Sequence, residues 1–284
     1  MRVCLSCDAR FQGPSWTCPS CRSSPANGSF PSFAPELVDA GFESNWFADL
    51  AAVEADSFWF RARNRVVSWA LDTYFRNADS LLEIGCGTGF VLAELREARP
   101  QLALTGADAA TEGLKVARSR LPGVPLLQLD ARRLPFEGEF DVVAAFDVLE
   151  HIAEDEVVLE QMFAATKPGG GLLALVPQHP WLWNEHADAG HERRYRRAEL
   201  DAKVRAVGFA VVRSTSFVSL LLPLMAASRR FERWNSDDPV GELRAAQRLG
   251  GLLERVLDLE RAVIRRGVSF PAGGSRLVVA RKGA

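Results

Sequence analysis

The chain has 284 residues, of which 48% are hydrophobic and 25% are charged, and its net charge at pH 7 is −2. This is the composition of an ordinary folded protein, and the charge excludes a general basic field that would attract nucleic acid or anionic membranes. The chain begins with clustered cysteines rather than an apolar leader, and no stretch is apolar enough to cross a bilayer, so we expect a cytoplasmic protein.

Residues 1–24 carry two Cys-x2-Cys pairs separated by ten residues. Four thiolates at this spacing are typical of a structural zinc ribbon, and a segment this short needs metal to fold. The alternatives are two disulfides, which a reducing compartment disfavours, and four free thiols, which the clustering of nearly all the cysteines disfavours. We expect Phe11 and Trp16 to pack beneath the knuckles, and the alternative is that they form a docking face. The predicted zinc ligands are Cys4, Cys7, Cys18 and Cys21.

Residues 25–35 are rich in Ser, Pro, Gly and Asn, which predicts a linker to a main domain at 36–284. Residues 36–78 predict an aromatic, helical N-terminal cap. From residue 80, short apolar runs alternate with helical stretches, as in a parallel sheet of βαβ units. The predicted strands are 80–84, 102–107, 126–129, 140–146, 171–176, 209–215 and 275–281, and the predicted helices are 89–98, 111–120, 155–165 and 197–207.

Segment 216–270 is predicted to be a helical insertion or lid. It begins with the apolar run 217–227, which suits a buried or lid helix. The alternative is contact with a membrane surface or a greasy substrate through 217–234, with Arg229, Arg230 and Trp234 at the interface.

A glycine-rich turn follows the strand that ends near Glu83. The sequence Gly85-Cys86-Gly87-Thr88-Gly89 precedes a helix, whose free N–H groups can bind a carboxylate or a pyrophosphate. A dinucleotide fingerprint would need glycine at position 90, where this chain has Phe90. Asp108 and Asp130 end the next two strands, where they can accept hydrogen bonds from a ribose and an adenine amine.

The motifs LLEIGCGTGF, GADAA, LLQLDARRLPF, FDVVAAFDVLEHI and KPGGGLLALVP resemble, in order and spacing, those of class I S-adenosylmethionine-dependent methyltransferases of the type 11 and type 23 kind. The resemblance covers about residues 80–215. It implies a Rossmann-like α/β fold, with a mostly parallel seven-stranded sheet, a reversed last strand and helices on both faces. It implies a cofactor site formed by Glu83, Gly85, Cys86, Gly87 and Gly89 at the methionine end, Asp108 and Ala109 at the ribose, Asp130 and Ala131 at the adenine, and Phe146 facing the methyl group.

The candidate reaction site follows strand 140–146. Asp147, Glu150 and His151 stand at i, i+3 and i+4, which share one face of a helical turn. His151 can act as a general base, or the three can hold a divalent cation. The second pattern resembles metal-dependent O-methyltransferases of ubiquinone biosynthesis and of small-RNA 3′ ends, which have Glu at the position of Asp147. Alternatively, Glu150 and His151 only cap the next helix. A later catalytic or metal-binding residue would be His179, His186 or His191.

Loop 178–195 is too long for a simple connection and lies where ligands bind in open α/β folds. Its H-x-R-R-Y segment resembles a bacterial subfamily associated with surface-glycan and lipid-linked pathways. The same subfamily resemblance covers 59–65, where Arg61 or Arg63 can pair with the cofactor carboxylate. For the H-x-R-R-Y segment, the alternative is a basic flank of the next helix held by Glu192 and Glu199. For residues 59–65, the alternative is a helix whose arginines lie in solvent. The predicted acceptor contacts are Trp181, His191, Arg194 and Tyr195.

These patterns predict a methyltransferase that acts on an oxygen of a small-molecule, glycan or lipid-linked acceptor. One alternative is an RNA methyltransferase that uses the ribbon as its nucleic-acid module, although the charge of −2 and only Arg2, Arg10 and Arg22 in the ribbon argue against it. Another is a non-catalytic adaptor that senses the cofactor and recruits a protein partner through the ribbon.

Overall fold

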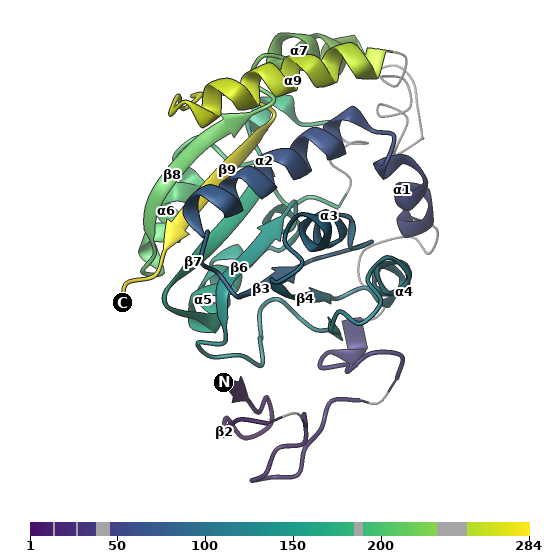
Figure 1. The fold of residues 1–284 in the computed structure, drawn as a ribbon, viewed down its shortest axis with the longest axis vertical. Helices are drawn as coiled ribbons and strands as arrows, with labels where there is room; N and C mark the ends of the chain where they lie inside the picture. Colours follow the sequence, from purple (N-terminus) through teal and green to yellow (C-terminus); the bar gives the residue numbers. More distant parts are fainter. Residues whose placement is uncertain (14, 27, 38–45, 185–189, 232–248) are drawn as a thin grey trace.

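A computed structural model describes the chain except for residues 14, 27, 38–45, 185–189 and 232–248 (Figure 1). The main domain has a seven-stranded sheet of order β5-β4-β3-β6-β7-β9-β8, in which β9 is antiparallel to both of its neighbours and the pairs from β5 to β7 are parallel. The predicted sheet is confirmed. Its strands are β3 (Ser80–Ile84), β4 (Ala103–Asp108), β5 (Leu126–Gln128), β6 (Phe140–Phe146), β7 (Thr166–Pro177), β8 (Ala210–Phe217) and β9 (Ser275–Arg281).

Strand β7 begins five residues before the predicted position. Its first residues, Thr-Lys-Pro-Gly-Gly, read as a turn, but Thr166 already pairs with Phe140 across a bulge. Glycine is needed here because a Cβ at Gly171 would lie 2.2 Å from the Ala280 carbonyl oxygen. The glycines therefore mark a close approach of neighbouring backbones within the sheet.

Helices cover both faces of the sheet, because its strands are buried on both sides. One core lies between the sheet and α2 (Phe58–Tyr74), α3 (Phe90–Ala98), α4 (Thr111–Arg120) and α9 (Gly250–Arg265), and the other lies under α5 (Asp155–Ala165) and α6 (Glu199–Ala206). The remaining described helices are α1 (Trp46–Glu54), α7 (Leu222–Phe231) and the short 3-10 turns η1 (Pro35–Leu37), η2 (Leu149–His151) and η3 (Pro180–Leu182). None of the described helices could span a membrane.

The N-terminal ribbon contains a two-residue hairpin, β1 (Arg2–Val3) and β2 (Arg10–Phe11), and lies at the end of the molecule opposite α7 and α9 (Figure 1). Within the segment expected to be a linker, residues 31–33 lie along the outer edge of β5. There the Phe33 N–H donates to the Gln128 carbonyl at 2.8 Å, and the Gln128 N–H donates to Pro31 at 3.0 Å.

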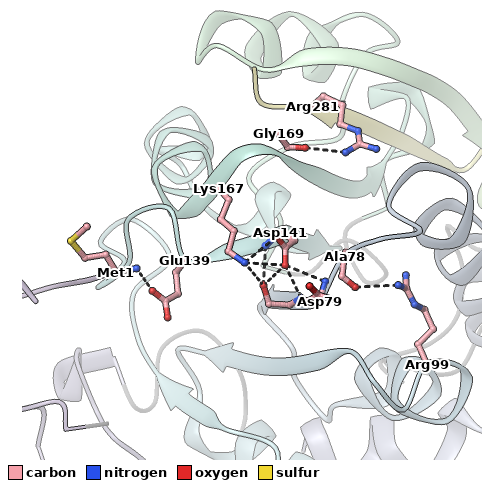
Figure 2. Close-up of polar contacts among 10 residues, drawn as sticks. Met1, Ala78, Asp79, Arg99, Glu139, Asp141, Lys167, Gly169 and Arg281 are labelled. Carbon is pink, nitrogen blue, oxygen red and sulfur yellow. Dashed lines mark hydrogen bonds and ion pairs between the residues drawn. The ribbon is translucent and has the colours of Figure 1, made fainter. Parts of the chain in front are cut away.

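Polar contacts tie together the amino ends of three central strands (Figure 2). Asp141 accepts hydrogen bonds from the Ser80 hydroxyl at 2.7 Å and from Lys167 Nζ at 3.0 Å. Burial opposes ionisation of this carboxyl, but these donors lower the pKa of Asp141. The network lies at the edge of the sheet opposite the strand ends that carry the predicted site.

Candidate active site

The glycine turn between β3 and α3 has a conformation that side chains would prevent. Gly85, Gly87 and Gly89 have φ values of 66°, 49° and 73°, in the left-handed region. A Cβ at Gly85 would lie 2.3 Å from Val148, and one at Gly89 would lie 2.7 Å from Leu121. The turn is therefore packed tightly from behind, so that only bare backbone fits.

Asp108 closes the next strand and is aimed at this turn. Its carboxylate accepts from the Gly87 N–H and the Ala110 N–H, each at 2.8 Å. Burial raises the pKa of Asp108, and these two backbone donors oppose the rise. The side chain is thus held at the carboxyl edge of the sheet, beside the glycine turn.

Two buried groups of opposite charge next to the turn are incompletely satisfied. Among the described residues, Glu83 Oε2 and Arg63 Nε have no hydrogen-bond partner. Burial, reinforced by Asp108 and Glu54, raises the pKa of Glu83 to about 8, and Arg63 lowers it only in part. A buried polar atom left unpaired costs roughly 1–3 kcal/mol, so such atoms mark a place where a ligand completes the bonding.

Arg63, rather than Arg61, faces the site. Arg61 and Arg65 share one face of α2, four residues apart, and both pair with Glu254 of α9, at 2.5 and 2.7 Å. Arg63 lies on the other side of the helix and donates to Asp147 at 2.8 Å. The structure therefore directs Arg61, the predicted cofactor residue, toward α9.

Helix α1 is fastened over the glycine turn by a polar network that sequence reasoning missed. Thr88 Oγ1 donates to the buried Glu54 at 2.6 Å, and Arg120 Nη1 donates to the same carboxylate at 2.6 Å. Phe47 of α1 lies against the turn, 3.7 Å from a Cβ built on Gly87. These residues are distant in the chain, and no sequence pattern links them.

The residues after β6 do not form the single helical face that was predicted. Asp147 adopts φ 56°, and the chain then makes the 3-10 turn η2, so the Asp147 carboxylate turns toward Arg63. Burial raises the pKa of Asp147, and Arg63 opposes the rise. The interpretation of Asp147, Glu150 and His151 as one face is therefore wrong, because the left-handed residue ends the strand.

His191, rather than Asp147, joins Glu150 and His151. Their potential ligand atoms lie within 4.8 Å of one another, and the two imidazole rings are perpendicular with centroids 4.4 Å apart. His151 Nδ1 lies 2.9 Å from the Gly190 carbonyl oxygen. Since a carbonyl can only accept, Nδ1 carries the proton, and the lone pair of the neutral ring is on Nε2.

The segment around His191 is anchored by its neighbours. Arg193 donates to the carbonyls of Ile152 and Ala153, at 2.7 and 2.9 Å, and so fixes the end of η2. Sequence reasoning marked this segment but not Arg193. Tyr195 is fully buried, and its hydroxyl donates to Asp155 at 2.6 Å.

The other predicted acceptor residues differ in exposure. Trp181 is 60% exposed, whereas Arg194 is 5% exposed and donates through Nε to the Gln178 carbonyl at 3.4 Å. Burial and the neighbouring Arg194 lower the pKa of His179. His186 lies outside the described residues.

Residues 81–170 match a protein family described as a methyltransferase domain. The demethylmenaquinone methyltransferase of Lactococcus lactis is 33% identical over 125 residues, 40% of this chain and 50% of that protein. The ubiquinone biosynthesis O-methyltransferase of Bordetella bronchiseptica is 35% identical over 98 residues, 32% of this chain and 39% of that protein. This chain thus spans half or less of these curated relatives.

Solved structures share the fold over about three quarters or more of the chain. A chain in the complex between the Haloferax volcanii Trm112 methyltransferase activator and a putative methyltransferase superposes with a TM-score of 0.54 at 21% identity, covering 84% of this chain and 98% of that one. A putative methyltransferase from Bacillus halodurans gives a TM-score of 0.51 at 17% identity, covering 76% and 97%. Residues 81–170 are thus similar in sequence to a methyltransferase domain, and the chain shares the fold of these solved structures.

Asp130 and Ala131 follow β5 at the same end of the sheet as Asp108. Arg132 pairs with Asp130, Nη2 to Oδ2, at 2.9 Å and also with Glu154 at 3.2 Å. The Arg132 N–H donates to Asp130 Oδ1 at 2.8 Å. Both carboxylate oxygens of Asp130 are therefore bonded by Arg132, within the turn that follows β5.

The N-terminal ribbon brings its four cysteines together. Sγ–Sγ distances are 3.5 Å for Cys4 and Cys21 and 3.7 Å for Cys7 and Cys18. A tetrahedron with zinc–sulfur bonds of about 2.3 Å has edges of about 3.8 Å, so the cluster fits the ion.

Proposed function

We propose that the protein transfers the methyl group of S-adenosylmethionine to a hydroxyl oxygen of a small-molecule, glycan or lipid-linked acceptor. The observation that carries the proposal is the pair of buried, incompletely bonded groups of opposite charge, Glu83 and Arg63, beside the bare glycine turn. An α-amino acid carries the complementary ammonium and carboxylate, and the methionine end of this cofactor is such a group.

The neighbouring strand ends supply the remaining contacts of this proposal. Asp108 would accept from the ribose hydroxyls, and Asp130 with Ala131 would hold the adenine. When bound, the cofactor supplies an electrophilic methyl group on a sulfonium. The residues of the chain hold acceptor and methyl in line, an effect that lowers a barrier by roughly 7–11 kcal/mol in favourable cases.

The choice of oxygen rests on His151. Its Nδ1 proton bonds to the Gly190 carbonyl oxygen, so Nε2 is the atom that takes a proton from an acceptor hydroxyl. Arg193 fixes the turn that carries this ring. The presence of an O-methyltransferase among the relatives also supports an oxygen acceptor.

Two measurements test the proposal. Calorimetry with S-adenosylhomocysteine should detect binding that Arg63→Lys weakens about tenfold or more, because lysine lacks the fork that grips a carboxylate. The matched variant Arg61→Lys changes the same residue type on the α9 side and should bind normally. Screening acceptor pools with labelled S-adenosylmethionine should then label a hydroxyl compound. If the wild type binds no S-adenosylhomocysteine, the cofactor assignment is wrong.

A divalent cation bound at the acceptor end is an alternative to the His151 base. Glu150, His151 and His191 have the donor types and the spacing for such an ion. A cation-dependent reaction would stop in a chelator that leaves the ribbon zinc in place, and Mg²⁺ or Mn²⁺ would restore it. The His151 base predicts turnover that the chelator does not change.

The RNA and adaptor alternatives make different predictions. Of the three ribbon arginines, Arg2 stacks on Trp16, with its Cζ 3.9 Å from the ring centroid, and Arg10 pairs with Glu137, so both are engaged with their own chain. An RNA enzyme would bind RNA with a steep salt dependence. An adaptor would bind S-adenosylhomocysteine tightly and label no acceptor in any pool.

Contact with a lipid surface through 217–234 stays a prediction. Leu220, just before α7, is 42% exposed, and Leu224, within α7, is 54% exposed. Trp234 lies outside the described residues. A lipid-linked acceptor predicts that the protein sediments with anionic vesicles, and that Leu220→Ser with Leu224→Ser reduces the bound fraction.

A further inference from the structure

The connection between β5 and β6, residues 129–139, differs from the other crossovers of the parallel sheet. Helices α3, α4 and α5 each follow one strand and cover the sheet before the next, but residues 129–139, all of them described, contain no helix. This connection begins at Asp130 and Ala131, the proposed adenine contacts. Its position must therefore be fixed by something other than a helix of its own.

The ribbon packs onto this connection. The Trp16 ring lies with its centroid 5.8 Å from Phe136 and 4.9 Å from Phe33, both edge-on. Phe136 belongs to the core beneath this face of the sheet, together with Leu129 and Leu134, and Trp16 packs against the same core. Trp16 was expected beneath the knuckles, but it lies at the interface with the main domain.

Backbone hydrogen bonds reinforce the contact. The Val3 N–H donates to the Pro135 carbonyl at 3.0 Å, and the Glu137 N–H donates to the Met1 carbonyl at 2.8 Å. The Arg133 side chain donates to the carbonyl of Leu5, the residue after zinc ligand Cys4. The Cys4–Cys7 knuckle is thus hydrogen-bonded to Arg133, three residues after Asp130.

A second attachment reaches the ribose side. Gln128 is fully buried, and its side-chain amide bonds to Ser32 Oγ at 2.6 Å and to the Ala34 carbonyl at 2.6 Å. The same amide donates to the Ala109 carbonyl at 3.0 Å, next to Asp108. The segment that leads out of the ribbon therefore contacts the neighbouring corner of the proposed cofactor site.

We propose that the metal-loaded ribbon positions the adenosine end of the cofactor site, so that zinc binding and cofactor binding are thermodynamically coupled. A ribbon this small folds only around its metal. Without metal, Leu5 and Trp16 lose their fixed positions, and the connection that carries Asp130 must be ordered when the cofactor binds. The inference rests on the proposed cofactor site, and it makes the ribbon a positioning element of that site.

The test measures S-adenosylhomocysteine affinity by calorimetry on the full-length protein, before and after zinc removal with a chelator. Removal should weaken binding about tenfold, within the usual range of coupling between sites. Coupling is reciprocal, so saturating S-adenosylhomocysteine should raise the zinc affinity, measured by equilibrium competition with a chromophoric chelator, by the same factor. Because this equilibrium also contains the metal-free chain, the variants below, measured on zinc-loaded protein, test the coupling even if the metal-free chain unfolds.

Three variants locate the coupling. Trp16→Ala in the zinc-loaded protein should weaken S-adenosylhomocysteine binding nearly as much as zinc removal, and Arg133→Gln by about threefold. Arg22→Gln is the matched control, because this ribbon arginine is exposed and close to Cys21 but lies outside the interface contacts described above. It should change the affinity by less than about twofold.

The outcomes separate this inference from the proposed function. Absence of S-adenosylhomocysteine binding to the wild type would remove the cofactor site itself. Binding that stays within about twofold on zinc removal, with zinc affinity that ignores the ligand, would overturn the coupling alone. An effect of Arg22→Gln as large as that of Arg133→Gln would mean that the ribbon acts through general stability, and would also overturn it.

Discussion

The Glu83–Arg63 pair at the proposed cofactor end and the Asp155 cluster below the proposed acceptor end treat buried charge differently. At the cofactor end, Glu83 and Arg63 each keep a buried polar atom without a partner among the described residues. At the acceptor end, the buried Asp155 is bonded by Tyr195 at 2.6 Å and Lys203 at 2.7 Å and paired with Arg193 at 3.3 Å.

The difference separates residues that await a ligand from residues that hold the structure. Buried polar groups in folded proteins are nearly always satisfied, so an unsatisfied pair beside the bare glycine turn points to a missing partner. A satisfied cluster instead lends rigidity to whatever it carries, here the turn with Glu150 and His151. We therefore expect the Asp155 cluster to act by positioning this turn, and the Glu83–Arg63 pair to be completed by a ligand.

The largest expected effect is at Asp108. Asp108→Ala should weaken S-adenosylhomocysteine binding by more than about 100-fold, because two charge-assisted hydrogen bonds at roughly 1.5–3 kcal/mol each are lost. The matched control is Asp141→Ala, which removes a carboxylate of similar bonding at the opposite sheet edge and should reduce stability but not affinity. Calorimetry on protein with an intact circular dichroism spectrum decides, and near-normal affinity would refute the ribose assignment.

The second largest effect is expected at His151, at the acceptor end of the proposed site. His151→Ala should lower turnover by about 10²–10⁴-fold, the usual contribution of a general base, while S-adenosylhomocysteine affinity stays unchanged. The measurement is labelled methyl transfer to the acceptor found in the screen, with calorimetry in parallel. Full turnover would return His151 to a purely structural role in capping the turn.

Much of the fold follows from sequence because the strands are short apolar runs with clear ends. Strands 80–84, 140–146 and 275–281 and helices 111–120 and 155–165 agree with the structure at both ends. The glycine turn was predictable too, since three alternate glycines between strand and helix permit little else. The start of β7 was not, because its glycines serve close packing that only the folded sheet reveals.

The site was predictable by position but not by contact. Periodicity places Arg61 and Arg63 on opposite sides of a helix, but only the packing of α9 decides which side faces the cofactor. The left-handed Asp147 broke the expected helical face, and its carboxylate pairs with the buried Arg63 instead. The docking of Trp16 depends on a connection that lacks a helix, and composition alone does not foresee such a gap.

A smaller effect is expected in the pH dependence of S-adenosylhomocysteine binding. Glu83 must lose its proton to accept an ammonium, and its pKa in the free protein is about 8. S-adenosylhomocysteine affinity should therefore rise by up to about tenfold between pH 7 and 8.5. Glu83→Gln should flatten this rise, and calorimetry across the pH range measures both proteins.

The raised pKa of Glu83 also determines how the stability of the folded protein changes with pH. Its pKa is raised from 4.5 to about 8, so the folded chain holds a proton that the unfolded chain releases. Its contribution to stability is complete below about pH 4.5 and is lost as the pH rises through about 8. A profile of free protein in which wild type and Glu83→Gln lose stability in parallel from pH 6 to 9 would contradict the raised pKa.

The smallest expected effect decides what Tyr195 does. Tyr195 was predicted to contact the acceptor, but its hydroxyl is buried on Asp155, which together with burial raises the pKa of Tyr195. Tyr195→Phe keeps the ring and removes one hydrogen bond to a charged group, so it should cost about 1.5–3 kcal/mol of stability. The melting temperature should fall by several degrees, at about 2–4 °C per kcal/mol for a domain of this size.

Kinetics then separates anchoring from contact in the same variant. An anchor acts through the Gly190–Tyr195 segment, so loosening it should lower kcat modestly while the acceptor KM stays within about twofold. A hydroxyl that touched the acceptor would give the opposite result, a raised KM with unchanged stability. Because Asp155 keeps Lys203 and Arg193 as partners after the change, the buried carboxylate stays paired, and the loss reports the tyrosine hydroxyl alone.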